Sequence, residues 1–95
     1  MNTVIWSTTA IDDLTEIAKK TGSISPAYST YLVKKLLDRP SILETKPESG
    51  RLVPEMENDD PNVRELLEGH YQIIYRYRHD TVTILKVVTS RIPLK

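Results

Sequence analysis

The chain has 95 residues, contains no cysteine, and balances 13 Lys and Arg residues with 13 Asp and Glu residues, so its formal net charge is zero at pH 7. This length fits one compact domain, residues 1–95, whose core is small because a chain of this size buries only about 60 to 65 % of its unfolded surface. The lack of cysteine excludes disulfide bonds and thiolate catalysis, and the charge balance argues against a protein that coats nucleic acid through many unopposed cations.

The distribution of charged and apolar residues narrows the class of protein further. Residues 61–95 carry six Lys or Arg against three Asp or Glu, so the C-terminal third is basic, while the segment EMENDD, residues 55–60, reads as an acidic loop. No run of about 18 apolar residues occurs, and the N-terminus lacks a basic start followed by an apolar stretch. We therefore expect a soluble, cytoplasmic protein with no membrane partner.

The N-terminal segment predicts a strand followed by a helix. Residues 3–7, TVIWS, are apolar and rich in β-formers, which favours a strand. Residues 7–22 place apolar side chains on one helical face, with acidic residues early and lysines late, which suits the helix dipole. Ser7 or Thr8 is expected to cap this helix, and Gly22 to end it.

A second helix is expected directly after the first. Ser25 is a good N-cap, and Pro26 suits the first helical position because its missing N–H has no helical partner there. Pro40 removes a donor and disfavours helix at the residue before it, so we expect a break there, with Asp38 capping a final turn.

The C-terminal half predicts a run of four strands. Segments 51–55, 63–68, 71–78 and 81–89 are rich in β-branched, apolar or aromatic residues and are separated by turn or loop signals. Pro54 suits an edge position in the first of them. The predicted fold is therefore α/β of the α+β type, with an N-terminal strand and a helical hairpin that packs on one face of a mainly antiparallel sheet.

Alternation along the strand 71–78 predicts two different faces, because successive side chains of a strand point to opposite sides. One face carries Tyr71, Ile73, Tyr75 and Tyr77. The other carries Gln72, Ile74, Arg76 and Arg78. We expect the tyrosine face to pack against the helices and the arginine face to point away from them.

A two-residue turn at 79–80 would fix the register between the last two strands. The predicted facing pairs are Arg78 with Thr81, Arg76 with Thr83, Ile74 with Leu85, and Gln72 with Val87. The same parity places Thr89 and Arg91 on the polar face. It places Lys86 and Val88 with the tyrosines, where Lys86 is the one misfit.

The arginine face has two interpretations. It is either a solvated surface that charge keeps soluble, or a docking surface, because apolar members such as Ile74, Leu85 and Val87 adjoin its cations. The segment KPESGR has two interpretations as well. Glu48 and Arg51 either lie at the mouth of the sheet or form a surface ion pair on a turn.

Signals for a cofactor are missing from the sequence. His70 and His79 have no cysteine or tight acidic cluster at the spacing of metal ligands. Neither a glycine-rich phosphate loop nor a nucleophile elbow occurs. We therefore expect no metal and no small-molecule cofactor.

The sequence resembles the RelE/ParE superfamily of bacterial type II toxins. The matching features are a tryptophan followed by AIDDLTEIA, the middle segment ILETKPESGRLVPE, the segment NVRELLEGHYQIIYRYRHDTVTILKVV and the closing TSR. They cover nearly the whole chain in order, and their series is most similar to the ParE branch. The resemblance implies a small toxin of that fold, neutralised by a cognate antitoxin protein encoded beside it.

The branch of this superfamily that cuts messenger RNA on the ribosome implies one set of site residues. In that branch an arginine usually follows the first tyrosine of a YRIIY-like motif, and a C-terminal tyrosine or histidine helps in proton transfer. Here Gln72 stands at the arginine position and Arg91 matches a C-terminal arginine, but the chain ends in IPLK. If the chain is a nuclease, the catalytic candidates are Arg91, Arg76, His70 and Glu48.

The ParE branch implies inhibition of DNA gyrase by binding, which needs no catalytic set in the toxin and suits this sequence better. The candidate target-binding residues are then Arg76, Arg78, Arg91 and Lys95. A RelE-like, ribosome-dependent endoribonuclease remains the alternative. A third possibility is an inactive toxin that is kept as a partner-binding module.

The resemblance also implies a surface for the antitoxin, because such antitoxins lay a helix and an extended segment along apolar surface. The candidates on the helical hairpin are Tyr28, Tyr31 and Leu32. The candidates on the sheet edge are Leu52 and Val53, because an edge strand offers unpaired backbone groups to an added strand. Packing of these side chains within the toxin itself is the other possibility.

Overall fold

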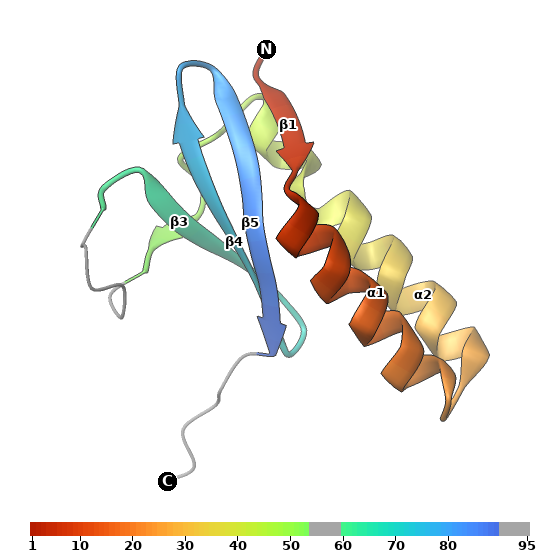
Figure 1. Ribbon diagram of the computed structural model, residues 1–95. Coiled ribbons are helices and arrows are strands. Elements are labelled where there is room, and N and C mark those ends of the chain that lie inside the picture. Colours follow the sequence, from red (N-terminus) through yellow and green to blue (C-terminus); the bar gives the residue numbers. More distant parts are fainter. Residues whose placement is uncertain (54–59, 90–95) are drawn as a thin grey trace, which may run out of the picture.

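The computed structural model describes residues 1–53 and 60–89. Its elements in chain order are β1 (Thr3–Trp6), α1 (Thr8–Gly22), α2 (Pro26–Asp38), the 3-10 helix η1 (Arg39–Glu44), β2 (Arg51–Leu52), β3 (Val63–Glu68), β4 (Tyr71–Arg78) and β5 (Thr81–Thr89). The two long helices form a hairpin beside one face of the sheet, and no helix covers the other face in the part of the chain that is described (Figure 1). The predicted α+β fold class is confirmed.

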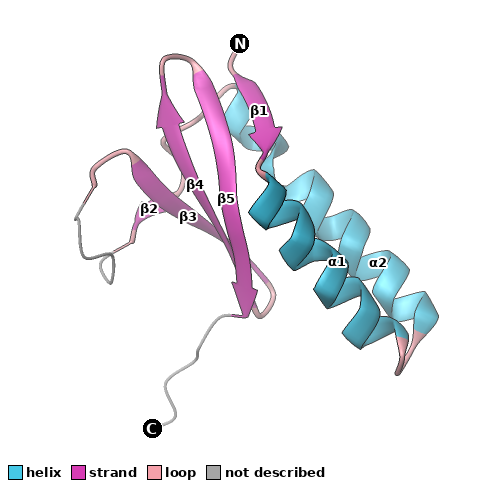
Figure 2. Cartoon of the chain, in the orientation of Figure 1, coloured by secondary structure: helices cyan, strands magenta, loops and turns pink. Residues whose placement is uncertain are grey.

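The sheet has five strands in the order β1-β5-β4-β3-β2. β1 pairs with β5 in parallel, and all the other neighbours pair antiparallel, so the sheet is mainly antiparallel as predicted (Figure 2). β1 and β2 form its two edges. Among the described residues no helix is both long and apolar enough to cross a membrane.

Both long helices start at the residues that the sequence indicates. The Ser7 hydroxyl accepts a hydrogen bond from the backbone N–H of Ala10 at 3.1 Å, and the Ser25 hydroxyl accepts one from that of Tyr28 at 3.2 Å. α2 ends before Pro40, and the chain continues as the 3-10 helix η1. The predicted cap of this last turn is wrong, because the Asp38 side chain makes no capping hydrogen bond.

The main core lies between the helical hairpin and the sheet. Its buried members from the helices are Ala10, Leu14, Leu32, Leu36 and Leu43, and those from the sheet are Leu66, Ile73, Tyr75, Val82, Ile84 and Val87. Trp6, Tyr71 and Tyr77 are partly buried and pack against this core. The tyrosine face of β4 therefore points toward the helices, as expected from alternation.

The register between β4 and β5 follows the prediction for half of its length. Arg78 pairs with Thr81 and Arg76 with Thr83, but a β-bulge then shifts the register between Ile74 and Tyr75. The two further predicted pairs are wrong: Ile74 faces Lys86, and Gln72 faces Val88. The cause is an extra residue on the β5 side of the bulge, which a simple alternation rule omits.

The bulge changes the faces of the residues that follow it. Lys86 shares the face of its partner Ile74 and is exposed, so it is no misfit, whereas Val87 is buried in the main core. Val88 points away from the helices beside Gln72. Thr89 pairs with Tyr71 on the helix side, so its predicted place on the polar face is wrong. Arg91 lies outside the described residues.

Helix α1 and the residue before it hold the bulge in place. The Ser7 hydroxyl donates a hydrogen bond to the carbonyl of Leu85 at 3.2 Å. The backbone N–H of Val87 donates to the Asp13 carboxylate at 3.0 Å. Since β1 pairs with β5 only as far as Ile84, these side chains bond backbone groups of β5 beyond the end of β1.

Candidate functional site

The face of the sheet that points away from the helices, here called the outer face, brings together residues from all five strands. The strand register sets them in rows across the sheet. The rows are Thr3, Thr81 and Arg78; Ile5, Thr83, Arg76 and Val63; Lys86, Ile74, Glu65 and Arg51; and Val88, Gln72 and Leu67. The outer face therefore mixes cations, threonines and apolar side chains.

A small apolar cluster lies within the outer face. Val53, Val63 and Ile74 are buried in it, and Leu85 and Val88 pack against them while partly exposed. This cluster is separate from the main core, and it accounts for the apolar members of a face that also carries arginines. The outer face is thus more than a uniformly solvated surface.

Glu65 is the one charged side chain among the described residues that is fully buried, with 2 % of its surface exposed. Its carboxylate accepts hydrogen bonds from Nε of Arg51 and from the side-chain amide of Gln72. A buried charge is tolerated when it is paired and hydrogen-bonded, and both carboxylate oxygens are bonded here. Arg51 therefore pairs with Glu65, not with Glu48 as the turn interpretation suggested.

Sequence reasoning missed Glu65 as a site residue. Glu65 lies two residues from both Val63 and Leu67 on the same strand, so its side chain shares a face with these apolar neighbours. An acidic residue at such a position is a signal for a buried ion pair. Its partner could not be named, because Arg51 comes next to it only through the pairing of β2 with β3.

The turn before β2 is bound to the sheet by a buried tyrosine. The Tyr75 hydroxyl donates to the carbonyl of Pro47 at 2.8 Å and accepts from the N–H of Gly50 at 3.0 Å. Arg64 Nη1 donates to the Gly50 carbonyl at 2.9 Å. Burial raises the pKa of Tyr75 above its usual value of 10.0, and the Gly50 hydrogen bond and the Arg64 charge lower it in part.

Gly50 has no room for a side chain. A Cβ atom there would lie 2.6 Å from the Tyr75 hydroxyl oxygen and 2.6 Å from the backbone carbonyl oxygen of Glu65. Both distances are far shorter than van der Waals contact. The Glu65 carbonyl is a backbone group, so it cannot move aside as a flexible side chain could. The glycine of KPESGR is thus required by close approach.

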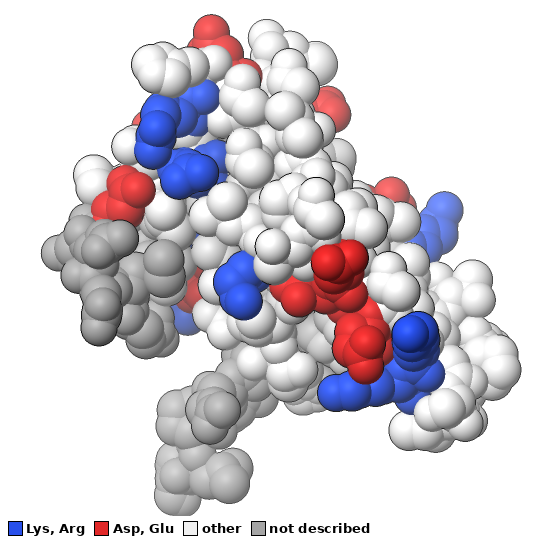
Figure 3. All heavy atoms as spheres, in the orientation of Figure 1, with Lys and Arg blue, Asp and Glu red and all other residues white. Residues whose placement is uncertain are grey.

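The two described target-binding candidates share the outer face, as predicted. Arg76 is half-buried and Arg78 is exposed, and the ion pairs found among the described residues involve neither of them. Figure 3 shows Lys and Arg side chains gathered at the upper left, over the region of the β4–β5 hairpin in Figure 1. Arg91 and Lys95 lie outside the described residues.

The described members of the candidate nuclease set do not come together. His70 lies in the β3–β4 turn, and Arg76 is six positions further along β4, about 20 Å away at roughly 3.4 Å per residue. Glu48 lines a hollow of about 450 Å³ with Tyr77, whose side chain is on the helix side, opposite to that of Arg76. The fourth candidate, Arg91, is outside the described residues.

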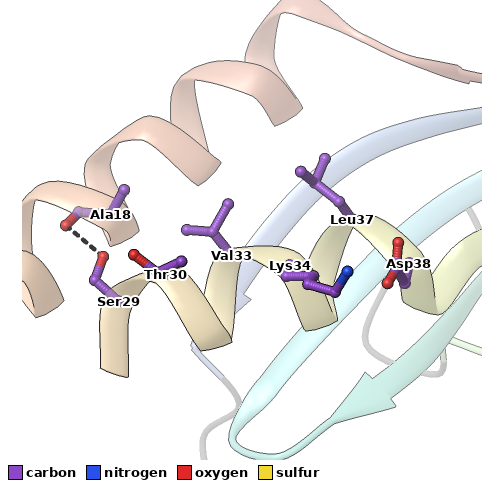
Figure 4. A pocket seen from close by; sticks show the side chains of 7 residues that line it. All are labelled: Ala18, Ser29, Thr30, Val33, Lys34, Leu37 and Asp38. Atoms are coloured by element: carbon purple, nitrogen blue, oxygen red, sulfur yellow. Dashed lines mark hydrogen bonds between the residues drawn. The ribbon is translucent and has the colours of Figure 1, made fainter. Parts of the chain in front are cut away.

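A groove lies along α2 beside Ala18 of α1. It has a volume of about 400 Å³ and is lined by Ala18, Ser29, Thr30, Val33, Lys34, Leu37 and Asp38. Figure 4 shows six of these side chains along α2 and Ala18 on α1. A hydrogen bond of 3.0 Å from the Ser29 hydroxyl to the carbonyl of Ala18 joins the two helices. Leu37 is 46 % exposed, so the groove offers apolar surface.

The antitoxin-binding candidates divide into exposed and buried residues. Tyr28 and Tyr31 are exposed on α2, with ring centroids 6.4 Å apart, and Leu52 is exposed at the β2 edge. Leu32 lies in the main core and Val53 in the outer-face cluster. These two side chains pack within the chain, so they offer no surface to a partner in this structure.

Comparison with known proteins identifies the family. The family model described as "ParE toxin of type II toxin-antitoxin system, parDE" matches residues 4–92. The chain belongs to this ParE toxin family. Among curated proteins, none matches the sequence.

Two solved structures share the fold of this ParE family member. One is described as a chromosomal ParDE toxin–antitoxin system from P. aeruginosa, with a TM-score of 0.80 and 23 % identity, covering 96 % of this chain and 98 % of that chain. The other is the toxin–antitoxin complex RelBE2 from Mycobacterium tuberculosis, with a TM-score of 0.62 and 25 % identity, covering 93 % of this chain and 90 % of that chain.

Proposed function

We propose that this ParE family toxin acts by binding DNA gyrase, not by cutting RNA. The observation that carries the proposal is the hydrogen bond from Gln72 to the buried Glu65 carboxylate. Gln72 stands where the resemblance to the nuclease branch expects an arginine. In this chain the position carries an uncharged amide, and the nearest charge on the same face is a carboxylate.

The electrostatics of this region oppose RNA cleavage. A phosphodiester gains negative charge in the transition state and needs preorganised positive groups around it. The Glu65 carboxylate repels such an anion, and Arg51, which could attract it, is already paired with Glu65. The uncharged amide at Gln72 and the carboxylate at Glu65 therefore act in the same direction.

The spread of the acid–base candidates supports the same proposal. A general base has to lie within hydrogen-bond reach of the proton that it takes, about 2.6 to 3.2 Å or one water molecule away. His70 and Arg76 are separated by most of the length of β4, and Glu48 lies on a turn over the other face. A binding inhibitor needs no such convergence, and the outer face offers Arg76 and Arg78 for contact.

An assay pair separates the two modes of action. Purified toxin is added to gyrase with supercoiled plasmid, and to translating ribosomes with messenger RNA. We expect loss of gyrase activity with accumulation of cleaved DNA, and intact messenger RNA. Ribosome-dependent cuts that disappear in Arg91→Ala, with no effect on gyrase, would support the endoribonuclease instead. Absence of growth arrest on induction without the antitoxin would indicate an inactive toxin.

We further propose that a cognate antitoxin covers the groove along α2. Its apolar lining and its charged rim at Lys34 and Asp38 suit an amphipathic helix, which binds through residues spaced along one face. The exposed Tyr28 and Tyr31 continue this surface along α2, and Leu52 offers a place at the sheet edge for an extended segment. Both structural neighbours named above come from toxin–antitoxin systems, which supports such a partner.

The groove is tested by an exposed substitution and a matched control. Leu37→Asp places a charge in the groove, and we expect it to weaken antitoxin binding at least tenfold in calorimetry, about 1.4 kcal/mol. Ile24→Asp makes the same change at a residue that is 87 % exposed and lies in the α1–α2 loop, so binding should stay within twofold. Equal effects of the two variants would contradict this placement.

A further inference from the structure

The β4–β5 turn has a backbone conformation that its residues do not favour. Arg78 pairs with Thr81, so the turn has two residues, and both have positive φ: 55° at His79 and 60° at Asp80. Two-residue turns with two positive φ angles match the twist of the strands, but they strongly prefer Asn-Gly. A side chain with a Cβ is strained in this region, although His and Asp tolerate it better than most.

The turn at the other end of β4 places a glycine where its backbone has positive φ. The β3–β4 turn also has two residues, and glycine occupies its position of positive φ, at Gly69. The strained turn is instead held by neighbours: the Thr3 N–H donates to the Asp80 carbonyl at 3.1 Å, and the Thr81 hydroxyl donates to the His79 carbonyl at 3.4 Å. Strain that the surroundings maintain is a recognised mark of functional positions.

The side chains around this turn suit contact with another molecule. Arg78, His79 and Asp80 are all exposed. The next row of the outer face holds Arg76, Thr83 and Ile5, of which Ile5 is 48 % exposed. Figure 1 shows the turn beside β1 at the end of the sheet opposite to the β3–β4 turn, and far from the loop that joins α1 and α2.

We propose that this turn is the part of the toxin that docks on its protein target, where acidic side chains of the target face Arg76 and Arg78, and where His79 and Asp80 are specificity-determining contacts. The proposal rests on the proposed function and assigns the target contact to a defined element. Arg76 and Arg78 supply the positive charge, and the ion pairs of the described residues leave both available. His79 donates to a carboxylate of the target, and Asp80 accepts from a backbone or side-chain donor.

The mixed chemistry favours a protein partner over a nucleic acid. Protein interfaces combine arginine with apolar surface, and the rows around the turn combine Arg76 and Arg78 with Ile5 and threonines. Binding to a phosphate backbone depends on unopposed cations, and here the exposed Asp80 carboxylate lies at the tip itself. A DNA-binding surface would carry the opposite charge at that position.

The test replaces the strained turn by an ideal one. The double variant His79→Asn/Asp80→Gly has the preferred turn sequence, so we expect its Tm to rise by roughly 4 to 8 °C and its antitoxin affinity to stay within twofold. We expect its gyrase inhibition to fall at least tenfold and its growth arrest to be lost. The single variants His79→Asn and Asp80→Gly distinguish the contributions of the two side chains. The control is Lys20→Asn, on the exposed side of α1, which should arrest growth as the wild type does.

Each outcome decides between the proposals. Full growth arrest by the more stable double variant would overturn the role of the turn. Wild-type protein that arrests growth without affecting gyrase, together with a double variant that does not arrest growth, would overturn the gyrase target and support the turn as the contact for another protein. Binding of wild type to linear duplex DNA that the double variant loses would overturn the choice of a protein partner.

Discussion

The two faces of the sheet are formed by alternate residues of the same strands, yet they differ in almost every property. On the helix side, Ile73, Tyr75 and Val82 have no exposed surface and belong to one continuous core. On the outer face, Ile74 belongs to a small separate cluster, and Arg76 beside it is only half-buried. The helix side secures the fold, which leaves the outer face free to carry charged side chains.

The largest contrast is expected between two neighbouring isoleucines of β4. Ile73 is fully buried under the helices, and Ile74 is 9 % exposed in the outer cluster. Truncation of a buried isoleucine to alanine costs about 2 to 5 kcal/mol, and we expect Ile73→Ala to cost about 4 and Ile74→Ala about 2. Urea denaturation of both variants measures the difference. Equal losses would mean that the two faces contribute equally to stability.

A glycine pair gives the next effect. Gly50→Ala forces a Cβ against the Tyr75 hydroxyl and the Glu65 carbonyl, and we expect a loss of about 3 kcal/mol. In the control Gly22→Ala, the nearest atom to the new Cβ is the Ser29 hydroxyl oxygen at 3.7 Å, an ordinary contact, so stability should stay equal or rise by about 0.5 to 1 kcal/mol. Thermal and urea unfolding of both variants check this. A Gly50→Ala variant that is as stable as Gly22→Ala would contradict the close approach of Tyr75 and Glu65 to Gly50.

The hydroxyl of Tyr75 gives a smaller effect that depends on pH. Tyr75→Phe leaves the Gly50 N–H and the Pro47 carbonyl without their partner, which costs about 1 to 3 kcal/mol at neutral pH. Burial raises the pKa of Tyr75 above 10.0, so the protonated hydroxyl contributes stability that is complete below about pH 10 and is lost as the pH rises through the folded-state pKa.

The unfolding free energies of wild type and Tyr75→Phe should therefore converge as the pH rises. The difference in unfolding free energy between wild type and Tyr75→Phe should be constant from about pH 7 to pH 9 and should shrink above about pH 10. Urea titrations at several pH values measure it, and other groups that ionise cancel between the two proteins. A difference that widens with pH would contradict the burial of a neutral hydroxyl.

The sequence contains enough to predict the fold where local signals and global packing agree. Ser7 and Ser25 begin helices because a hydroxyl at the N-cap bonds a free N–H, and Pro40 ends α2 because it lacks a donor. Alternation along β4 predicts that Arg76 and Arg78 point away from the helices. These features depend on near neighbours in the chain, so they can be read without coordinates.

The features that sequence reasoning missed depend on distant residues. The β5 bulge is held by Ser7 and Asp13, more than seventy residues away, and it reverses the predicted faces of Val87 and Val88. The burial of Glu65 depends on the pairing of β2 with β3, which brings Arg51 to it. A one-residue change of register inverts every later side chain, so such errors spread along a strand.

We propose that the outer face contacts the target of this ParE family toxin through Arg76 and Arg78. The most direct test of this contact is a gyrase supercoiling assay with the double variant Arg76→Ala/Arg78→Ala. The control is Lys19→Ala/Lys20→Ala, which removes the same charge from the exposed side of α1. We expect both variants to unfold within about 0.5 kcal/mol of wild type. Inhibition should fall at least tenfold in the arginine variant alone; equal inhibition by the two variants would contradict the claim.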